Sequence, residues 1–207
     1  MASDFKRRQA QEVCDKVREI IAEDKIIGVH LEPDSQRYYP YHDVAAQIIG
    51  FDHDTLTTAD GSRTKAGITF QLVDCLKTTY SMNGSNTNVN GWRGSTMRTS
   101  TMATLLNQLS SDLKSVLKFV NKVTSKGNNQ SGLETTSDKL FLLSEIEVFG
   151  ATQYSYAGEG KQYEYYTAGN STIKKVNGSA YHWWERSPYS GNTGSFCRVN
   201  GGGTADN

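Results

Sequence analysis

Apolar residues near the start of the chain recur with the spacing of an amphipathic helix. The i, i+3, i+4, i+7 pattern predicts a helix over residues 4–24, with Ser3 or Asp4 as its N-cap. Residues 28–32 (GVHLE) then predict a short strand, and residues 43–49 predict a short helix that ends at Gly50. The apolar stripe of the first helix is formed by Ala10, Val13, Cys14, Val17, Ile20 and Ile21.

After Phe51 the pattern changes. Residues 52–66 are polar and predict a loop, whereas residues 67–72 (GITFQL) alternate as a half-buried strand does. Residues 81–94 are rich in Asn, Gly and Ser and indicate a long loop, either ordered or mobile. A second helical stripe follows, with a break near Ser110 and Ser111. Its apolar side chains are expected in the core: Met102, Leu105, Leu106, Leu109, Leu113, Val116, Leu117 and Val120.

The last third of the chain combines strand patterns with one helix start. Residues 139–143 (KLFLL) form a short apolar run that predicts a buried strand. Ser144 and Glu147 have the spacing of a capping box, so a helix is expected to start there. Residues 181–186 and 195–199 predict two strands that SPYSGNTG joins as a hairpin. We therefore expect an α+β domain with a small sheet and two or three helices, preceded by a helical N-terminal arm.

Charge and cysteine content narrow the possible partners. The chain has 22 Lys and Arg against 22 Asp and Glu, so it lacks the positive field that non-specific binding to nucleic acid needs. Cys14, Cys75 and Cys197 are widely spaced and odd in number, which favours buried thiols over a disulfide framework or a zinc site. The first 30 residues carry charges throughout and offer no run for a signal peptide or membrane span, so the compartment is left unassigned.

The N-terminal segment carries a specific motif. Residues 27–41 (IGVHLEPDSQRYYPY) and 44–51 (VAAQIIGF) closely resemble the pedestal, or dimerisation, domain of class B penicillin-binding proteins. The resemblance covers about residues 1–51. It ends there because that family continues with a glycine-rich stretch ending in G-L-E, whereas this chain continues with DHDTLTTADGSRTKAG.

Residues from about 48 to 207 resemble a second family, a bacterial domain of unknown function found in extracytoplasmic and prophage-linked proteins. Seven blocks carry this likeness: IIGFDHD, KAGITF, YSMNGSNTNVNGW, MRTS, TTSDKLFLLSEIEVFG, YAGEGKQYEYY and WWERSP. The resemblance implies a relation to C-type-lectin-like and formylglycine-generating-enzyme-like folds. It also implies a domain that is incomplete at its C-terminus.

Both resemblances include Ile48–Phe51, a tetrapeptide at which two genes could be joined without a scar. We interpret the chain as a chimera, with a pedestal-like fragment at residues 1–50 and the second domain at residues 51–207.

The residues do not assemble a known catalytic set. A serine transpeptidase needs S-x-x-K, S-x-N and K-T-G. Ser111 and Ser115 each precede a lysine by three positions and Ser190-Gly-Asn192 matches the second pattern, but the chain has no K-T-G. Cys75 and Cys197 lack the context of the copper-binding pair of formylglycine-generating enzymes. We therefore expect a protein that is not an enzyme, needs no cofactor and is not labelled by a fluorescent β-lactam.

Metal-dependent binding is not indicated either. The calcium motifs of C-type lectins, E-P-N or Q-P-D with W-N-D, are missing from residues 51–207. Asp52, Asp54 and Asp60 could ligate a cation, but a solvated loop is the better interpretation. The four histidines show no metal spacing, so any binding is expected to be insensitive to EDTA.

Residues 154–198 combine many Tyr and Trp with Gly, Ser and Asn, a mixture typical of binding surfaces. Adjacent strand residues face opposite sides, so either Trp183 or Trp184 belongs to the core, and several Tyr could be structural too. A polar site of Arg98, Glu159, Glu185 and Arg186 is possible, although neighbouring acids and bases more often pair. The predicted binding residues are Tyr163, Tyr165, Trp184, Arg186 and Tyr189.

We expect a recognition domain that binds a cell-surface glycan or protein, with weak self-association possible. The alternative is a remnant of peptidoglycan-synthesis machinery that acts through residues 1–51. Both related families work outside the cytoplasm.

Overall fold

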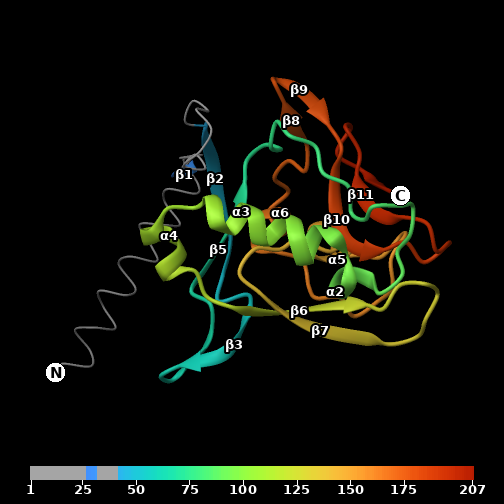
Figure 1. Cartoon of the computed structure of the whole chain (residues 1–207), viewed down its shortest axis with the longest axis horizontal. Coiled ribbons are helices and arrows are strands. Elements are labelled where there is room, and N and C mark those ends of the chain that lie inside the picture. Colours follow the sequence, from blue (N-terminus) through green and yellow to red (C-terminus); the bar gives the residue numbers. More distant parts are fainter. Residues whose placement is uncertain (1–26, 32–41) are drawn as a thin grey trace.

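The computed structural model describes residues 27–31 and 42–207, with side chains from Ala45 onward, so the predicted helix over residues 4–24 lies outside this part. Antiparallel strands form four small sheets (Figure 1). The first has the order β1 (Ile27–Leu31), β2 (His42–Phe51), β5 (Ile68–Leu72). The second has the order β4 (Arg63–Lys65), β3 (Thr55–Asp60), β6 (Val120–Ser125), β7 (Leu133–Asp138). The third has the order β10 (Trp183–Pro188), β11 (Phe196–Val199), β12 (Ala205–Asp206), and β8 (Lys174–Val176) pairs with β9 (Ser179–Tyr181).

Short helices connect these sheets. They are α2 (Gly91–Gly94), the π-helical turn η1 (Met97–Thr101), α3 (Met102–Gln108), α4 (Ser111–Val116), α5 (Glu145–Phe149) and α6 (Glu164–Thr167). Helix α6 contacts β2, and α5 contacts both α6 and β10, so the helices join the first and third sheets (Figure 1). The predicted α+β class is confirmed.

The predicted helix over residues 43–49 is wrong, because these residues lie in strand β2. Backbone pairing on both sides holds them extended: Ala46 is the partner of Ile27 in β1 and of Leu72 in β5. A register shift between Ile48 and Gly50 interrupts the ladder with β5, and both Ile48 and Ile49 are buried. Two adjacent buried residues break the alternating pattern of a strand, so the sequence resembles that of a helix. The pairing with neighbouring strands determines the extended conformation.

Residues 52–66 were predicted as a loop, but much of this segment forms the β3–β4 hairpin. Gly61 turns the chain with a positive φ of 62°. Leu56 is the buried residue of β3 and lies opposite Val120 of β6. An exposed ribbon of mostly polar residues has no alternating apolar pattern for the sequence to reveal. The strand predicted at 67–72 is confirmed as β5.

The predicted break in the second helical stripe is confirmed. Helix α3 ends before Ser110, whose side chain accepts a hydrogen bond from the Leu113 backbone and caps α4. The expectation of a fully buried stripe is wrong. Val116 is 64% exposed, whereas Leu109 and Val120 are buried. Val120 belongs to β6, because the helix has already ended at Val116.

Residues 139–143 are not a strand. The strand is β7, directly before them, and the apolar run is irregular chain that leads into α5. Its apolar character comes from core contacts: Leu143 lies in one buried cluster, and Phe141 packs against this cluster and against a second buried cluster, formed by Met82, Trp92, Met97 and Phe196. The capping box is confirmed, since Ser144 Oγ accepts from the Glu147 amide and Glu147 Oε2 accepts from the Ser144 amide.

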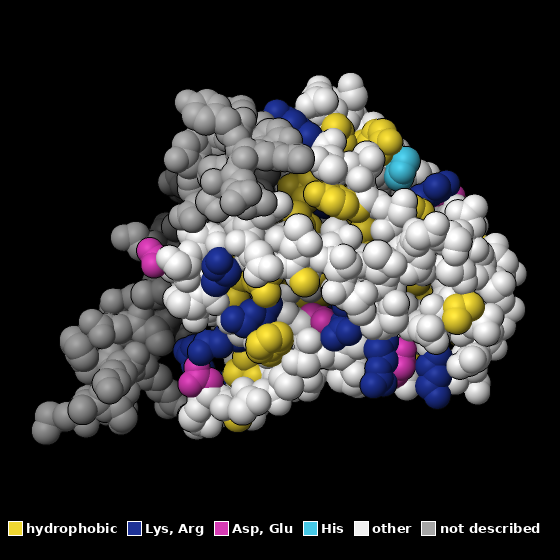
Figure 2. Space-filling view, viewed as in Figure 1, with side chains coloured by type: hydrophobic (Ala, Val, Ile, Leu, Met, Phe, Trp, Pro, Cys, Tyr) yellow, Lys and Arg dark blue, Asp and Glu magenta, His cyan; other side chains and the backbone are white. Residues whose placement is uncertain are grey.

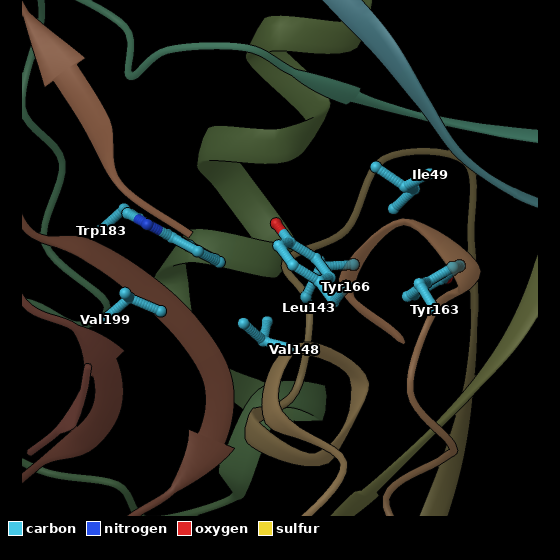
Figure 3. Close-up of a cluster of buried hydrophobic side chains, with 7 residues drawn as sticks. All are labelled: Ile49, Leu143, Val148, Tyr163, Tyr166, Trp183 and Val199. Carbon is cyan, nitrogen blue, oxygen red and sulfur yellow. The ribbon is translucent and has the colours of Figure 1, made fainter. Parts of the chain in front are cut away.

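The predicted hairpin is confirmed as β10 and β11, and its register fixes two faces. Trp183 lies opposite Val199, which lies opposite Ala205 of β12. Trp183 and Val199 belong to the cluster in Figure 3, where they approach Val148 of α5. The whole cluster is Ile49, Leu143, Val148, Tyr163, Tyr166, Trp183 and Val199. As expected, at least one of the adjacent tryptophans is core, and Trp184 lies on the opposite face.

Candidate functional site

Two of the five predicted binding residues lie in the interior. Tyr163 and Arg186 are fully buried and form part of one ionic network. The Arg186 guanidinium donates to both carboxylate oxygens of Glu147, and its Nη2 lies 2.9 Å from Oε1. Lys122 bridges Glu147 and Asp54, with Nζ distances of 2.7 and 2.8 Å. The Tyr163 hydroxyl donates to Asp54. Because these side chains are inaccessible, Tyr163 and Arg186 cannot contact a ligand at the surface.

Electrostatics explain how these charges remain buried. Burial alone would raise the pKa of Glu147, but Arg186 and Lys122 outweigh it and lower that pKa below its ordinary value. Burial also opposes ionisation of Asp54, yet Lys122 and hydrogen bonds from Thr69 and Tyr163 lower its pKa too. Each charge of this network therefore has a partner of opposite charge, which is typical of a structural network.

Three of the four residues of the possible polar site, Glu159, Glu185 and Arg186, are buried, and Arg186 donates to the Glu159 carbonyl at 2.7 Å, so they do not form an accessible site. Arg98 pairs with Asp138 at 2.7 Å. Glu159 accepts hydrogen bonds from the Ser125 amide and the Ser187 hydroxyl, and burial raises its pKa. Glu185 is buried, and among the described residues neither of its carboxylate oxygens has a hydrogen-bond partner. Burial, with the charges of Glu145 and Glu159 next in importance, raises the pKa of Glu185 well above its ordinary value.

The cation ligands and the serine–lysine pairs considered from the sequence have other partners. Asp54 belongs to the buried network, and Asp60 pairs with Lys118 at 3.0 Å. Lys114 donates to the Asn107 carbonyl, and Ser115 donates to the Asp112 carbonyl. Within the described part of the chain, no three His, Cys, Asp or Glu side chains are grouped so that they could hold a metal ion.

Tyr165 and Tyr189 pack against different neighbours. Tyr165 packs from α6 against the cluster of Figure 3 and meets Tyr166 edge-on. Tyr189 lies in the β10–β11 loop, where its ring meets Tyr154 edge-on with centroids 6.0 Å apart. The structure therefore does not bring the five predicted residues together as one site.

The face of the third sheet opposite Trp183 and Val199 carries a different group of side chains. Trp184 lies opposite Arg198, and Arg198 lies opposite Asp206, so one row crosses β10, β11 and β12. The His182 ring meets Trp184 edge-on at 6.4 Å and stacks on Tyr181 at 4.4 Å. We call Tyr181, His182, Trp184, Arg198 and Asp206 the Trp184 face. Figure 2 shows how hydrophobic and charged side chains are distributed over one face of the molecule.

Contacts on both sides hold the Trp184 face in place. The Trp184 indole donates to the Tyr80 carbonyl at 3.0 Å and packs against the second buried cluster. Arg198 donates through Nε to Asp206 Oδ2 at 2.9 Å, and Nη2 lies 2.8 Å from the same oxygen. Tyr181 and His182 are exposed. The result is a fixed aromatic surface beside a fixed pair of opposite charges.

Sequence reasoning selected Trp184 but missed His182, Arg198 and Asp206. The residue types alone gave no signal, because an Arg and an Asp eight positions apart have no motif spacing. The signal was strand register: aligning FCRV of β11 with the strand that contains WWERSP places Arg198 opposite Trp184.

A hollow of about 280 Å³ lies beside α5 and is lined by residues outside the Trp184 face. Glu145, Phe149 and Thr204 are among its lining residues. The Glu145 carboxylate already accepts backbone hydrogen bonds from Gln153, Tyr154 and Ser155. This carboxylate holds the loop after α5 in place. The hollow therefore offers fewer side-chain groups for hydrogen bonds to a ligand than the Trp184 face does.

Comparison with known proteins identifies the domain. The chain belongs to a family of domains of unknown function, DUF6273, whose family model matches residues 66–207. The expected membership of a family of unknown function is thus confirmed, with a match that starts later than residue 48. No curated protein matches the chain. No solved structure matches it. Among the described residues, the helices are too short or too polar to cross a membrane.

Proposed function

We propose that this chain is a non-catalytic recognition domain that binds a cell-surface glycan or protein on the Trp184 face. The observation that carries the proposal is the row of Trp184, Arg198 and Asp206 across three strands, extended by the exposed rings of His182 and Tyr181. Aromatic rings supply rigid contact area at low entropic cost, and neighbouring charges supply directional hydrogen bonds.

The interior supports a non-catalytic role. Glu147, Asp54 and Lys122 satisfy one another away from the surface. The S-x-x-K lysines are held by partners other than the serines that precede them. A nucleophile needs a base within hydrogen-bond reach, and these two patterns do not provide that arrangement.

The test compares exposed aromatic residues at two places. The double variant Tyr181→Ala, His182→Ala removes rings from the proposed site, whereas Phe119→Ala removes an exposed ring elsewhere. Binding to a glycan microarray and to intact bacterial cells should fall by about 1–3 kcal/mol in the double variant alone. Equal binding by both variants and the unaltered protein would reject the Trp184 face as the site.

The finer family likenesses support the same proposal. We propose a C-type-lectin-like architecture and an extracytoplasmic, prophage-linked setting on the basis of the blocks YAGEGKQYEYY and WWERSP. A binding role in such a domain does not require the calcium motifs, so EDTA should leave binding unchanged.

The alternative function rests on the pedestal-like sequence pattern. Its residues 27–31 and 42–51 include two strands that pair antiparallel, β1 and β2. If residues 1–51 dock to cell-wall synthesis machinery, the chain should co-purify with a pedestal-containing penicillin-binding protein. That interaction should survive the Tyr181→Ala, His182→Ala change, which separates the alternative from binding at the Trp184 face.

A further inference from the structure

The Arg198–Asp206 pair is built to accept another partner. Both contacts from Arg198 end on Asp206 Oδ2, so neither Oδ1 of Asp206 nor Nη1 of Arg198 takes part in the pair. Each side chain is 33% exposed. A guanidinium has five N–H donors and a carboxylate has two acceptor oxygens, so both side chains have hydrogen-bonding capacity beyond the pair.

The charge of this pair selects for a neutral ligand. Arg198 and Asp206 carry opposite charges at 2.8 Å and largely cancel each other at longer range. Burial works against ionisation of Asp206, but hydrogen bonds from the Asn207 backbone and Arg198 lower its pKa, so the carboxylate stays ionised at neutral pH. A ligand with alternating donors and acceptors fits this pair better than a polyanion or polycation.

The aromatic part of the face requires an apolar surface on the same ligand. Cross-strand pairing places Trp184 directly beside Arg198. His182 and Tyr181 extend the aromatic surface through an edge contact and a stacked contact. A pyranose ring meets both demands, since its C–H groups form an apolar face and its adjacent hydroxyls each donate and accept hydrogen bonds.

We infer that the Trp184 face binds a neutral hexopyranose. Its ring packs against Trp184 and His182, while two vicinal hydroxyls bind Arg198 and Asp206. One hydroxyl donates to Asp206, and the neighbouring hydroxyl accepts from Arg198. This inference rests on the proposed recognition function and narrows its ligand to a sugar.

The experiment uses the whole chain and four probes, the methyl glycosides of glucose, galactose, mannose and N-acetylglucosamine. Saturation-transfer NMR should detect binding of at least one probe at millimolar concentration. Asp206→Asn and Arg198→Gln should each weaken it at least fivefold. The matched control is Arg93→Gln, which removes an exposed ion pair with Glu134 elsewhere on the surface and should leave affinity unchanged.

Thermal melting of each variant shows whether it folds. The double variant Tyr181→Ala, His182→Ala distinguishes failure of the sugar inference from failure of the proposed recognition function. If no probe binds, yet this variant still loses binding to cells, the sugar inference is overturned and the recognition function stands. Unchanged probe affinity in folded Asp206→Asn and Arg198→Gln also overturns the inference. If neither probes nor cells bind, both proposals fail.

Discussion

Lys174 is a buried lysine. Among the described residues, the hydrogen bonds from its ammonium group go to backbone carbonyls and not to a carboxylate. Its ammonium group donates to the backbone carbonyls of Leu72 and Val73, and it lies 5.5 Å from the centroid of the Trp183 ring. Burial lowers the pKa of Lys174 from 10.5 to about 8, although Cys75 and Asp74 act in the opposite direction. Charging this group therefore costs folding free energy at neutral pH.

The sign of the pH effect follows from this lowered pKa. Between pH 8 and 10.5 the unfolded chain binds a proton at Lys174 that the folded chain has lost, so this contribution raises stability as pH rises. Below pH 8 both states are protonated and the contribution is constant. Lys174→Met should remove the rise, and Lys175→Met, at an exposed neighbour, should keep it. Urea unfolding at pH 7.5, 9 and 10 measures the difference. Parallel pH profiles for Lys174→Met and the unaltered protein would contradict the shifted pKa.

For Glu185 we predict the opposite dependence of stability on pH. Its folded pKa lies well above its ordinary 4.5, so above pH 4.5 the folded state retains a proton that the unfolded state loses. Stability from this group is thus complete below pH 4.5 and declines as pH rises toward the folded pKa. Glu185→Gln cannot ionise, so its stability relative to the unaltered protein should increase from pH 4.5 to 7.5. The exposed Glu164→Gln serves as the control, and a constant difference for Glu185→Gln would show that Glu185 is ionised when buried.

For single residues, the sequence indicated which side chains suit a binding surface, but it did not indicate which of them are buried. Trp184 could be selected because aromatic residues in a hairpin favour contact surfaces. The burial of Tyr163 and Arg186 could not, because it depends on Asp54 and Glu147, which the chain brings together from distant positions. Pairing of buried charges is a property of the folded chain and leaves no local pattern.

Among the elements, β2 ties the N-terminal part of the described chain to the core. Its residue Ile49 is 1% exposed and packs in the same cluster as Val148 and Tyr163 (Figure 3). Strand β5, within the family match, pairs with β2 along most of its length. The predicted boundary at residue 50 thus falls near the end of a strand that both sides share.

Truncating Ile49 tests this integration. Ile49→Ala should lower the free energy of unfolding by about 2–5 kcal/mol, because a buried aliphatic side chain leaves a cavity. Val116→Ala removes apolar atoms from a side chain that is 64% exposed and should change stability by less than about 0.5 kcal/mol. Chemical denaturation of both variants measures the contrast. A loss below about 1 kcal/mol for Ile49→Ala would mean that β2 is not part of the cooperative unit.

Elements with a strong local signal were predictable, and those that depend on partners were not. The capping box of Ser144 and Glu147 and the β10–β11 hairpin carry their own turn and cap chemistry. The β3–β4 hairpin and β2 are defined by neighbouring strands, and their sequences are either polar throughout or apolar at helical spacing.

For the whole molecule, the described core joins strand β2 to the helices and strands of the family domain. One buried cluster combines β2, α5, α6 and the β10–β11 hairpin, and the other includes residues of α2, η1 and β11. If the chain is a chimera, as we propose, the N-terminal arm that this core could lose lies before β2, because Ile49 of β2 is buried in the core. Backbone pairing of β2 with β5 and the packing of Ile49 in the first cluster join residues 42–51 to the family domain.

Limited proteolysis with size-exclusion chromatography tests this organisation in the full chain. Cleavage between about Asp24 and Asp43 should leave a compact, monomeric remainder, because such a cut spares the pairing of β2 with β5 and every buried side chain from Ala46 onward. Cleavage inside β2 should be slow, since its backbone is paired on both sides. The remainder should elute at a constant volume at low micromolar concentration, and concentration-dependent elution would show that loss of β1 exposes a strand edge that associates. A protease-resistant chain of 207 residues that unfolds in one cooperative step would instead show that the arm has become part of the core, and the boundary at residue 50 would then be wrong.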